Sequence, residues 1–479
     1  MKLSSKFSNQ FSAPFSIQNS KRLFSVVGMA CLAYLGANQS ALGLESAAIA
    51  QEATSTQGAT STQLVRKYEV RADLQAYEYR LKNGLTVMVI PNNKAPLTAV
   101  YHWVKAGSLH ETPGITGIAH LFEHMMFRPQ KEGEPGFMEA VRAMGGSANA
   151  STSFESTVYT TTVPTKNLEA LLALEGRRFK NMKVTDALLD VERKAVWSEY
   201  STTFDSDPIT DLWYNLYKYA YVKHPFGWTN IGYREDLNGI KAKNCNTFFE
   251  KYYTPNNVGL VISGNVDAAK TLEWVEKAYG DWKPGPAVEL PPAYRGPEKY
   301  SVTEGKLPSQ NKQVLVGYRI PYLTSANIDS LFFINHVLFD SGFNLAKRRL
   351  VDKSRVAAEV SGYGFDGSAG MMTAYLSLLP GKTPEMAIKE LAKLPADFDA
   401  INNNEFEAYL KEYQVSQAEG LLRNESVANA MAMSWGKFND ANRVAEWSKK
   451  PMPLKKQDIS TVLKKMLRTQ NTTAVSTKN

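Results

Sequence analysis

The segment GIAHLFEHMMF holds two histidines and a glutamate at a spacing that suits a metal ion. On a helix, His120 and His124 lie about 40° apart around the axis, and Glu123 lies close to the same face. Two imidazoles at this spacing can hold a cation such as Zn²⁺. The carboxylate beside them can take a proton from a water molecule that the cation activates. The pattern therefore predicts a metal-assisted hydrolytic site.

A catalytic zinc ion needs a third protein ligand and an open fourth position. The helical segment LLDVERKAVWSEYS offers two carboxylates, Glu192 and Glu199, which lie two helical turns apart and so share a face. One of them could bind the metal while the other orients a ligand or the water. The spacing alone leaves open which glutamate takes which role.

HLFEH followed by ERKAVWSE resembles the inverzincin pattern of the pitrilysin/insulinase family of zinc peptidases, in its bacterial processing-peptidase-like branch. The resemblance implies a zinc endopeptidase that cleaves unfolded peptides. It implies that His120, His124 and Glu199 bind Zn²⁺, that Glu123 is the general base, and that Glu192 is a supporting acid. The match covers most of residues 75–285, through the further blocks GSLHETPGITGIAHLFEHMMF, GGSANASTSFESTVYTTTVP, HPFGWTNIG and YYTPNNVGLVISGNVD.

The same resemblance assigns the strand after Gly146 to substrate binding. In the family, an extended peptide adds to this edge strand through main-chain hydrogen bonds. Asn149 is the matching substrate-binding position, and Phe154 is expected to contact a substrate side chain. Alternating Ser, Asn and Thr are also typical of a solvated sheet edge, so this is the alternative for the stretch.

The second half of the chain departs from the family pattern. Active members carry an Arg and a Tyr that orient the substrate carbonyl and steady the charge on the tetrahedral intermediate. Here Val351 stands in place of the Arg and Glu359 near the place of the Tyr, while Arg355 and Tyr363 have the wrong spacing. Loss of such a pair slows a reaction by roughly 10²- to 10³-fold.

Two-chain bacterial members of the family obtain the Arg and Tyr from a second chain. We therefore expect a homologous partner subunit, while the choice between a homodimer and a heterodimer stays open in the sequence. The alternative is a non-catalytic core or assembly subunit of the same fold. The intact ligand set and base favour the enzyme.

The helices and strands that must position these residues are expected in the same order in both halves of the chain. Helices are expected at 117–127, 166–180 and 185–203, and Asn83-Gly84 between alternating runs predicts a hairpin with a type I′ turn. Both halves read strand, helix, helix, strand, strand, helix, helix, which indicates two copies of one α+β unit. We expect two α/β-sandwich domains of the pitrilysin/mitochondrial processing peptidase type, namely a zinc-binding domain at 75–282, a Pro-rich linker at 283–300 and an inactive homologous domain at 301–475.

Composition and charge narrow the function classes. The 479 residues are 43% hydrophobic and 21% charged, which is typical of a folded chain of two or three domains. The net charge of +8 comes without a long basic run or an aromatic-basic stripe, so it gives little support to nucleic-acid binding. A mildly basic cleft for peptides fits the same charge.

The first fifty residues have the features of a secretory signal peptide. Scattered Lys and Arg precede the apolar run LFSVVGMACLAYLGA, and small residues up to Ala50 supply a cleavage site before a flexible segment at 51–74. The run is shorter than the roughly 20 residues of a membrane helix. We expect the periplasm or secretion, with an organelle transit peptide as the alternative. Cleavage leaves Cys245 as the lone cysteine, which excludes an intramolecular disulfide.

Overall fold

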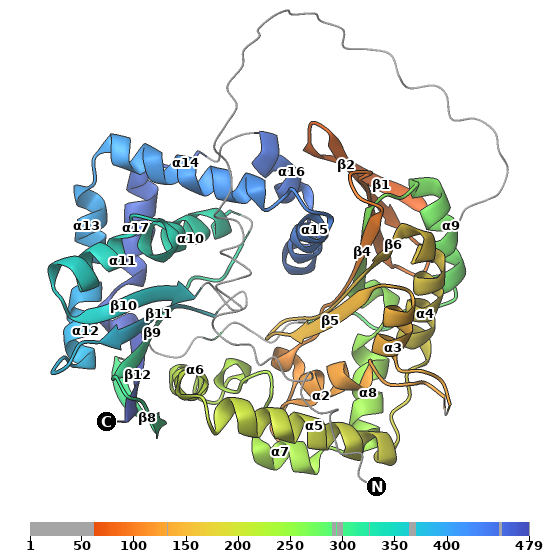
Figure 1. Ribbon diagram of the computed structural model, residues 1–479, viewed down its shortest axis with the longest axis horizontal. Helices are drawn as coiled ribbons and strands as arrows, with labels where there is room; N and C mark the ends of the chain where they lie inside the picture. The colour runs from red at the N-terminus through yellow and green to blue at the C-terminus, as the bar shows by residue number, and fades with distance from the viewer. Residues whose placement is uncertain are drawn as a thin grey trace, which may run out of the picture.

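The chain folds into two halves, each built on one β-sheet with helices packed against it (Figure 1). The computed structural model describes residues 62–131, 133–289, 294, 300–324, 326–363, 370–449 and 453–478. The expected signal peptide at 1–50 and part of the expected linker lie outside the described residues. Within the described part of the chain, no helix combines the length and the apolar character that a membrane crossing needs.

The first half contains a seven-stranded sheet in the order β1-β2-β3-β7-β4-β6-β5. β3 and β7 run parallel, and the other neighbours run antiparallel. The strands are β1 (Gln63–Arg71), β2 (Leu74–Arg80), β3 (Thr86–Pro91), β4 (Leu97–Val104), β5 (Ser147–Thr152), β6 (Thr157–Pro164) and β7 (Val258–Gly264).

β1 occupies chain that the sequence predicted to be flexible as far as residue 74. It pairs with β2 and buries Tyr68 and Val70 in an apolar cluster that the second half of the chain completes. That part of the prediction is wrong, because the apolar partners of this strand lie far away in the sequence.

The predicted hairpin is confirmed, but its turn is longer than expected. Leu81 N donates to Leu85 O, and the three residues between this pair form the loop instead of the two of a type I′ turn. Gly84 has a φ of +90°, the left-handed conformation that closes a three-residue hairpin loop.

The helices of the first half mostly cover one face of the sheet, where the largest apolar core lies. Those expected at 117–127, 166–180 and 185–203 are confirmed as α2, α4 and α5. The helices are α2 (Ile118–Met125), α3 (Phe137–Ala143), α4 (Leu168–Asn181), α5 (Asp186–Phe204), α6 (Pro208–Ala220), α7 (Arg234–Gly239), α8 (Ala242–Tyr252) and α9 (Ala268–Tyr279).

The second half contains a five-stranded sheet in the order β10-β11-β9-β12-β8. This order repeats β5-β6-β4-β7-β3 of the first sheet strand for strand, and in both sheets the last pair is the parallel one. The expected duplication of one α+β unit is therefore confirmed. The strands are β8 (Ser301–Pro308), β9 (Gln313–Arg319), β10 (Ala357–Tyr363), β11 (Met371–Leu378) and β12 (Thr472–Lys478).

The helices of the second half include two π-helical segments, η5 and η6, which continue α10 and α11. The elements are α10 (Ile328–Asn335), η5 (His336–Asp340), α11 (Leu345–Lys347), η6 (Arg348–Lys353), α12 (Pro384–Leu391), α13 (Leu394–Ala400), α14 (Asn403–Glu419), α15 (Asn424–Phe438), α16 (Asn442–Lys449) and α17 (Lys456–Met466).

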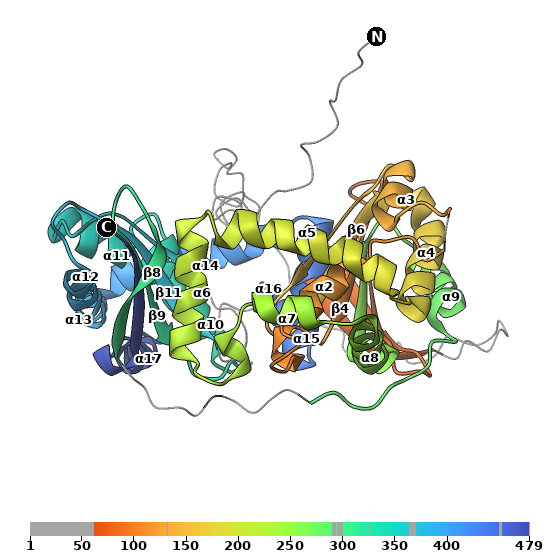
Figure 2. The same cartoon turned by 90° about the horizontal axis from the view of Figure 1, so that it is seen from below.

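The two halves exchange a helix in each direction. α6 of the first half packs on β8, β9 and β12, and α15 of the second half packs on β4 and β7 (Figure 2). Gly317 of β9 faces Leu216 of α6, and Gly259 of β7 lies under the indole ring of Trp435 on α15. A Cβ atom at Gly259 would collide with that ring. The linker therefore separates the two halves in the sequence, but α6 and α15 pack across the boundary between them in the fold.

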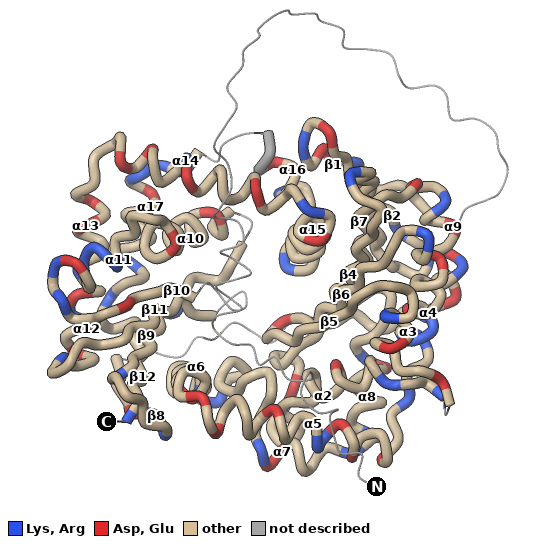
Figure 3. Tube along the Cα trace, viewed as in Figure 1, with Lys and Arg blue, Asp and Glu red and all other residues tan. Residues whose placement is uncertain are grey.

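Charged residues of both signs alternate along the helices of both halves, while the inner strands carry few of them (Figure 3).

The exchanged helix α15 should contribute strongly to stability. We predict that Trp435→Ala lowers the free energy of unfolding by about 3–5 kcal/mol, because it removes a large buried ring that fills the space above Gly259. Urea unfolding of the full chain measures the change. Trp274→Ala, at a half-buried tryptophan of α9, serves as the control and should cost less. Equal losses in the two variants would contradict the role of α15.

Candidate metal centre

The start of α2 is fixed by a buried carboxylate and two glycines. Glu111 accepts hydrogen bonds from the backbone N–H groups of Gly117 (2.8 Å) and Ala119 (3.0 Å), which satisfies donors that a helix start leaves open. Gly117 has a φ of +88°, and a Cβ atom there would collide with the carbonyl oxygen of Ile231. Gly232 packs as closely against the backbone of Thr116 and Gly117. The helix therefore begins at one defined place.

The three predicted ligands converge between α2 and α5. His120 Nε2 lies 3.6 Å from Glu199 Oε2, and His124 Nε2 lies 3.5 Å from the same oxygen. The donor atoms all lie within 4.8 Å of one another, and this is the one such group of three among the residues that the structure describes. Zinc bonds of 2.0–2.2 Å in a tetrahedron place two donor atoms about 3.4 Å apart. The three side chains fit a zinc ion.

The electrostatics of the centre also suit a cation. Burial lowers the pKa of His120 to about 4, which leaves the neutral imidazole that a metal requires. Burial acts in the same direction at His124, but the carboxylates of Glu192 and Glu199 outweigh it and raise the pKa of His124 to about 10. The surroundings of His124 therefore favour positive charge, whether a proton or a metal ion carries it.

Glu192 lies behind the ligands, at the nitrogen of His124 that faces away from Glu199. Its side chain is 2% exposed, and its Oε2 lies 3.5 Å from His124 Nδ1. Its other oxygen pairs with Arg128 Nε, just beyond the end of α2. A carboxylate in this position fixes the orientation of a ligating imidazole. Glu192 and Glu199 lie two helical turns apart on α5 and thus face different nitrogens of one ring.

Glu123 is buried next to the ligands and is held by one hydrogen bond. Thr152 Oγ1, at the end of β5, donates to Glu123 Oε2 at 2.6 Å. Burial raises the pKa of Glu123 to about 7, and the bond from Thr152 and the charge of His124 act against this rise. No sequence pattern indicates Thr152, because its contact with Glu123 joins two segments that only the fold brings together.

The expected substrate strand is the edge of the first sheet. β5 pairs with β6 on one side and ends the strand order, so no strand of the described residues pairs with its other side. Asn149 is exposed on β5, with its side-chain oxygen accepting a hydrogen bond from Ala150 N at 2.9 Å. The position allows the predicted contact with a peptide, which stays a prediction.

Phe154 lies in a different environment from the one expected. Its side chain is 4% exposed and packs against Tyr217 of α6 and Phe226, with ring centroids 4.9 and 4.8 Å apart. These rings belong to the apolar cluster that joins the halves. The position corrects the expectation of a substrate contact, because packing against α6, which is distant in sequence, covers the ring.

The second half retains part of the same constellation, which the sequence analysis overlooked. His336 of η5 lies 3.6 Å from Glu412 of α14, as His124 lies near Glu199 in the first half. Ser341 Oγ also donates to Glu412 at 2.6 Å. Two sequence patterns of the first half recur here. HVLF, which begins at His336, corresponds to HMMF, which begins at His124, and EFEAYLKE holds two glutamates at the same spacing as ERKAVWSE.

The remnant lacks two of the groups that the first half uses. Phe332 stands at the position of His120, and Asn335 stands at the position of Glu123. A phenylalanine cannot bind a metal ion and an asparagine cannot act as a general base. The centre in the first half is therefore the one that can support hydrolysis.

Three further histidines make contacts with neighbouring residues of the first half. His102 stacks on Phe179 at 4.3 Å between ring centroids and bonds to the hydroxyl of Tyr279. His110 accepts a hydrogen bond from Gly107 N, and His224 accepts one from Phe226 N. Each of these three histidines has a local role.

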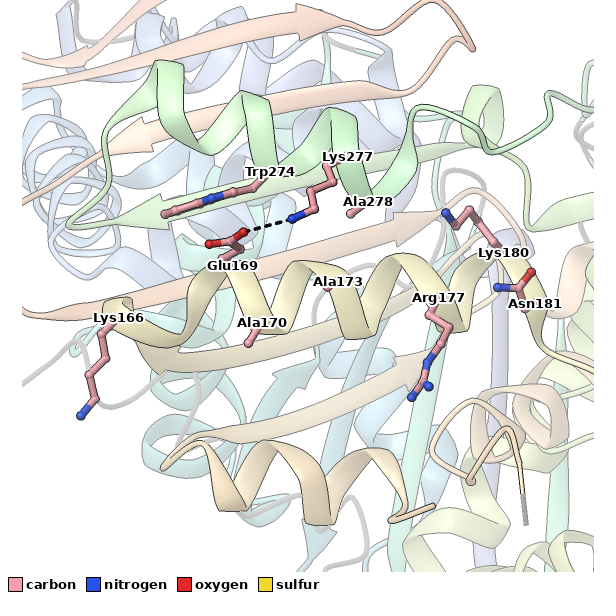
Figure 4. A pocket seen from close by; sticks show the side chains of 10 residues that line it. All are labelled: Lys166, Glu169, Ala170, Ala173, Arg177, Lys180, Asn181, Trp274, Lys277 and Ala278. Carbon is pink, nitrogen blue, oxygen red and sulfur yellow. Dashed lines mark hydrogen bonds and ion pairs between the residues drawn. The ribbon is translucent and has the colours of Figure 1, made fainter. Parts of the chain in front are cut away.

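A groove of about 580 Å³ lies on the outer surface between α4 and α9, away from this centre (Figure 4). Three of its four basic residues, Arg177, Lys180 and Lys277, are paired with Glu134, Asp281 and Glu169. These pairs compensate the charge, so we assign the groove no part in the chemistry. It is lined by Lys166, Glu169, Ala170, Ala173, Arg177, Lys180, Asn181, Trp274, Lys277 and Ala278.

The contact between Glu111 and the start of α2 makes a testable prediction. Glu111→Gln keeps the shape, but an amide has one acceptor oxygen and one donor nitrogen, so one of the two N–H groups loses its acceptor. We expect the free energy of unfolding to fall by about 2 kcal/mol in urea denaturation. Glu250→Gln, at an exposed position of α8, should leave stability unchanged. A neutral Glu111→Gln would contradict the capping role.

Comparison with known proteins agrees with this site. Residues 87–228 match the family described as insulinase (peptidase family M16), and residues 240–412 match the one described as the peptidase M16 inactive domain. The second match begins ahead of β7, which the structure places in the first sheet.

Individual relatives cover most or part of the chain. It is 26% identical over 405 residues to the zinc protease PqqE of Helicobacter pylori, covering 82% of this chain and 90% of that protein. It is 28% identical over 220 residues to mitochondrial-processing peptidase subunit beta of Blastocladiella emersonii, covering 45% and 47%.

A solved structure shows the same architecture. The crystal structure of a protease from Helicobacter pylori superposes with a TM-score of 0.76 at 25% identity, covering 84% of this chain and 99% of that one. With the two family matches and the duplicated fold, the chain belongs to peptidase family M16.

Proposed function

We propose that this protein is a zinc-dependent endopeptidase that hydrolyses peptide bonds in unfolded peptides. The observation that carries the proposal is the convergence of His120 and His124 of α2 with Glu199 of α5, next to the buried carboxylate of Glu123 on α2. The relative named as a zinc protease supports it. The edge strand β5 suits the backbone of an extended peptide, which favours unfolded peptides as substrates.

The chemistry divides among the residues of the site. Zinc, when bound by the three ligands, supplies positive charge that acidifies a water molecule and polarises the scissile carbonyl. Glu123 takes the proton from the attacking water and then delivers it to the nitrogen of the leaving amine. Glu192 holds His124 in its orientation, and β5 aligns the peptide backbone. Breaking the C–N bond releases a new carboxylate and a new amine.

We also propose that a homologous second subunit completes the site. Tyr363 packs against Trp213 of α6 at 5.5 Å between ring centroids, in the apolar cluster that joins the halves. Burial, together with the charges of Glu359 and Asp207, raises its pKa, so the phenol stays neutral among acidic groups. A neutral phenol can still donate a hydrogen bond to an oxyanion, but the ring of Tyr363 is committed to packing against α6. The relative named as subunit beta agrees with a two-chain assembly.

A second candidate is a non-catalytic core subunit of the same fold, exported to the periplasm or secreted like the proposed enzyme. One observation favours it, since the Arg and Tyr expected in the second half are replaced by Val351 and Glu359. Both candidates bind zinc in this proposal, so zinc content alone does not separate them. Proteolysis with a partner does.

The general base gives the first test. We predict that Glu123→Gln lowers kcat/KM about 10²- to 10⁴-fold on a quenched fluorescent peptide library, because an amide cannot take the proton. Zinc content by elemental mass spectrometry should stay at one per chain. The chain is assayed alone and with a homologous chain that carries the Arg and Tyr, and Glu139→Gln, exposed on α3, is the control.

The outcomes separate the candidates. Cleavage that needs the second chain and disappears in Glu123→Gln supports the two-chain peptidase. Cleavage by the chain alone contradicts the need for a different second chain and leaves a homodimer, or residues such as Arg355 and Tyr363, to replace the missing pair. If no mixture cleaves peptides although each chain binds one zinc ion, the result supports the non-catalytic subunit instead of the enzyme.

The two glutamates of α5 should differ in their effect on metal binding. We predict that Glu199→Ala abolishes stoichiometric zinc, because it removes one of three ligands. Glu192→Gln should keep the site but weaken zinc affinity about 10- to 100-fold, because it loosens His124. Competition with a zinc-chelating dye measures both. The reverse ranking would exchange the roles of the two residues.

A further inference from the structure

One residue connects the expected substrate strand to the expected base. Thr152 is the last residue of β5, is 7% exposed, and donates from Oγ1 to Glu123 Oε2 at 2.6 Å. The hydroxyl of Thr157 lies 3.4 Å from the same Oγ1 and donates to Ala106 O at 2.9 Å. Because Thr157 is committed to that carbonyl, the hydrogen of Thr152 is directed to Glu123.

The backbone of Thr152 is fixed from the other side. Asn230 Nδ2 donates to Thr152 O at 2.9 Å. Asn230 belongs to the block HPFGWTNIG, whose following residue Tyr233 donates its N–H to Thr116 Oγ1 at 2.8 Å. Gly232 of this block packs against the backbone of Gly117. The loop therefore ties the end of β5 to the start of α2, the helix that carries Glu123.

We infer that Thr152 is a positioning residue that sets the carboxylate of Glu123 relative to a peptide added on β5, with Asn230 holding Thr152 in place. The inference rests on the proposed function. A peptide that pairs with β5 takes its register from the backbone of that strand. Thr152, the last residue of the same strand, holds Glu123. The strand therefore positions both the scissile bond and the base.

The hydrogen bond between Thr152 and Glu123 does more than fill space, because it restricts the side-chain conformation of Glu123. A carboxylate with free rotation about its side-chain bonds would occupy several rotamers, and only some of them face the attacking water. The bond from Thr152 selects one of them. Valine has the shape of threonine without the hydroxyl, and serine keeps the hydroxyl without the methyl group, so the two substitutions separate hydrogen bonding from packing.

The test compares Thr152→Val and Thr152→Ser with the wild-type chain in the assembly that cleaves peptides. We expect Thr152→Val to lower kcat about 10- to 100-fold with KM and zinc content unchanged, and Thr152→Ser to recover most of the rate. Asn230→Ala should lower kcat in the same direction. Thr161→Val is the matched control, since Thr161 is a buried threonine of β6 that donates to a buried glutamate, Glu175, at 3.0 Å.

A crystal structure of each variant supplies a second readout that does not depend on cleavage. We expect the carboxylate of Glu123 to leave its wild-type position in Thr152→Val and to keep it in Thr152→Ser. Wild-type kcat and an unmoved Glu123 in Thr152→Val would overturn the inference. A loss of rate equal in Thr152→Ser and Thr152→Val would also overturn it, because packing would then explain the effect.

Failure of the inference and failure of the proposed function are distinguishable. If Glu123→Gln cleaves like the wild type, the proposed function fails. If Glu123→Gln is inactive while Thr152→Val cleaves normally, the inference alone fails. If no mixture cleaves peptides, the position of Glu123 in the crystal structures still decides whether Thr152 holds it.

Discussion

The structure depends on the burial of ionisable groups between α2 and α5. Charged groups removed from water must be paired, or the folded state loses several kcal/mol for each of them. His124 meets this requirement with Glu192 on one ring nitrogen and Glu199 on the other. Glu192 is paired in turn with Arg128, at the end of the helix that carries His124. The two helices can approach closely only in the arrangement that satisfies all these contacts.

This requirement explains why the surroundings of α2 are so closely specified. The helix start is fixed by Glu111 and by the contact between Gly117 and the loop that contains Gly232. A shift of one residue along the helix would turn its polar stripe away from α5 and into the apolar core. Positioning of the site and stability of the first half are thus parts of one packing arrangement.

The rest of the architecture follows from the duplicated α+β unit and from the helix that each half packs on the sheet of the other. The two sheets share one strand order, and each half covers a face of the other half's sheet with one helix. The remnant formed by His336 and Glu412 shows that the second copy kept the helix contact while it lost the chemistry. A half of this kind still has a physical task, because α15 covers the sheet that ends in β5. The second half thereby supports the centre without contributing a ligand to it.

The sequence by itself determined the helical stripe of α2, the paired glutamates of α5, the order of helices and strands along each half and the repeat. These are local patterns, in which spacing along the chain fixes which side chains share a face. Only the tertiary structure decided the contacts between distant segments. Phe154 was expected at a substrate and lies in the core, β1 was expected to be flexible and pairs in the sheet, and Thr152 carried no signal. Their environments come from helices and strands far along the chain, and no local pattern encodes which of those will meet.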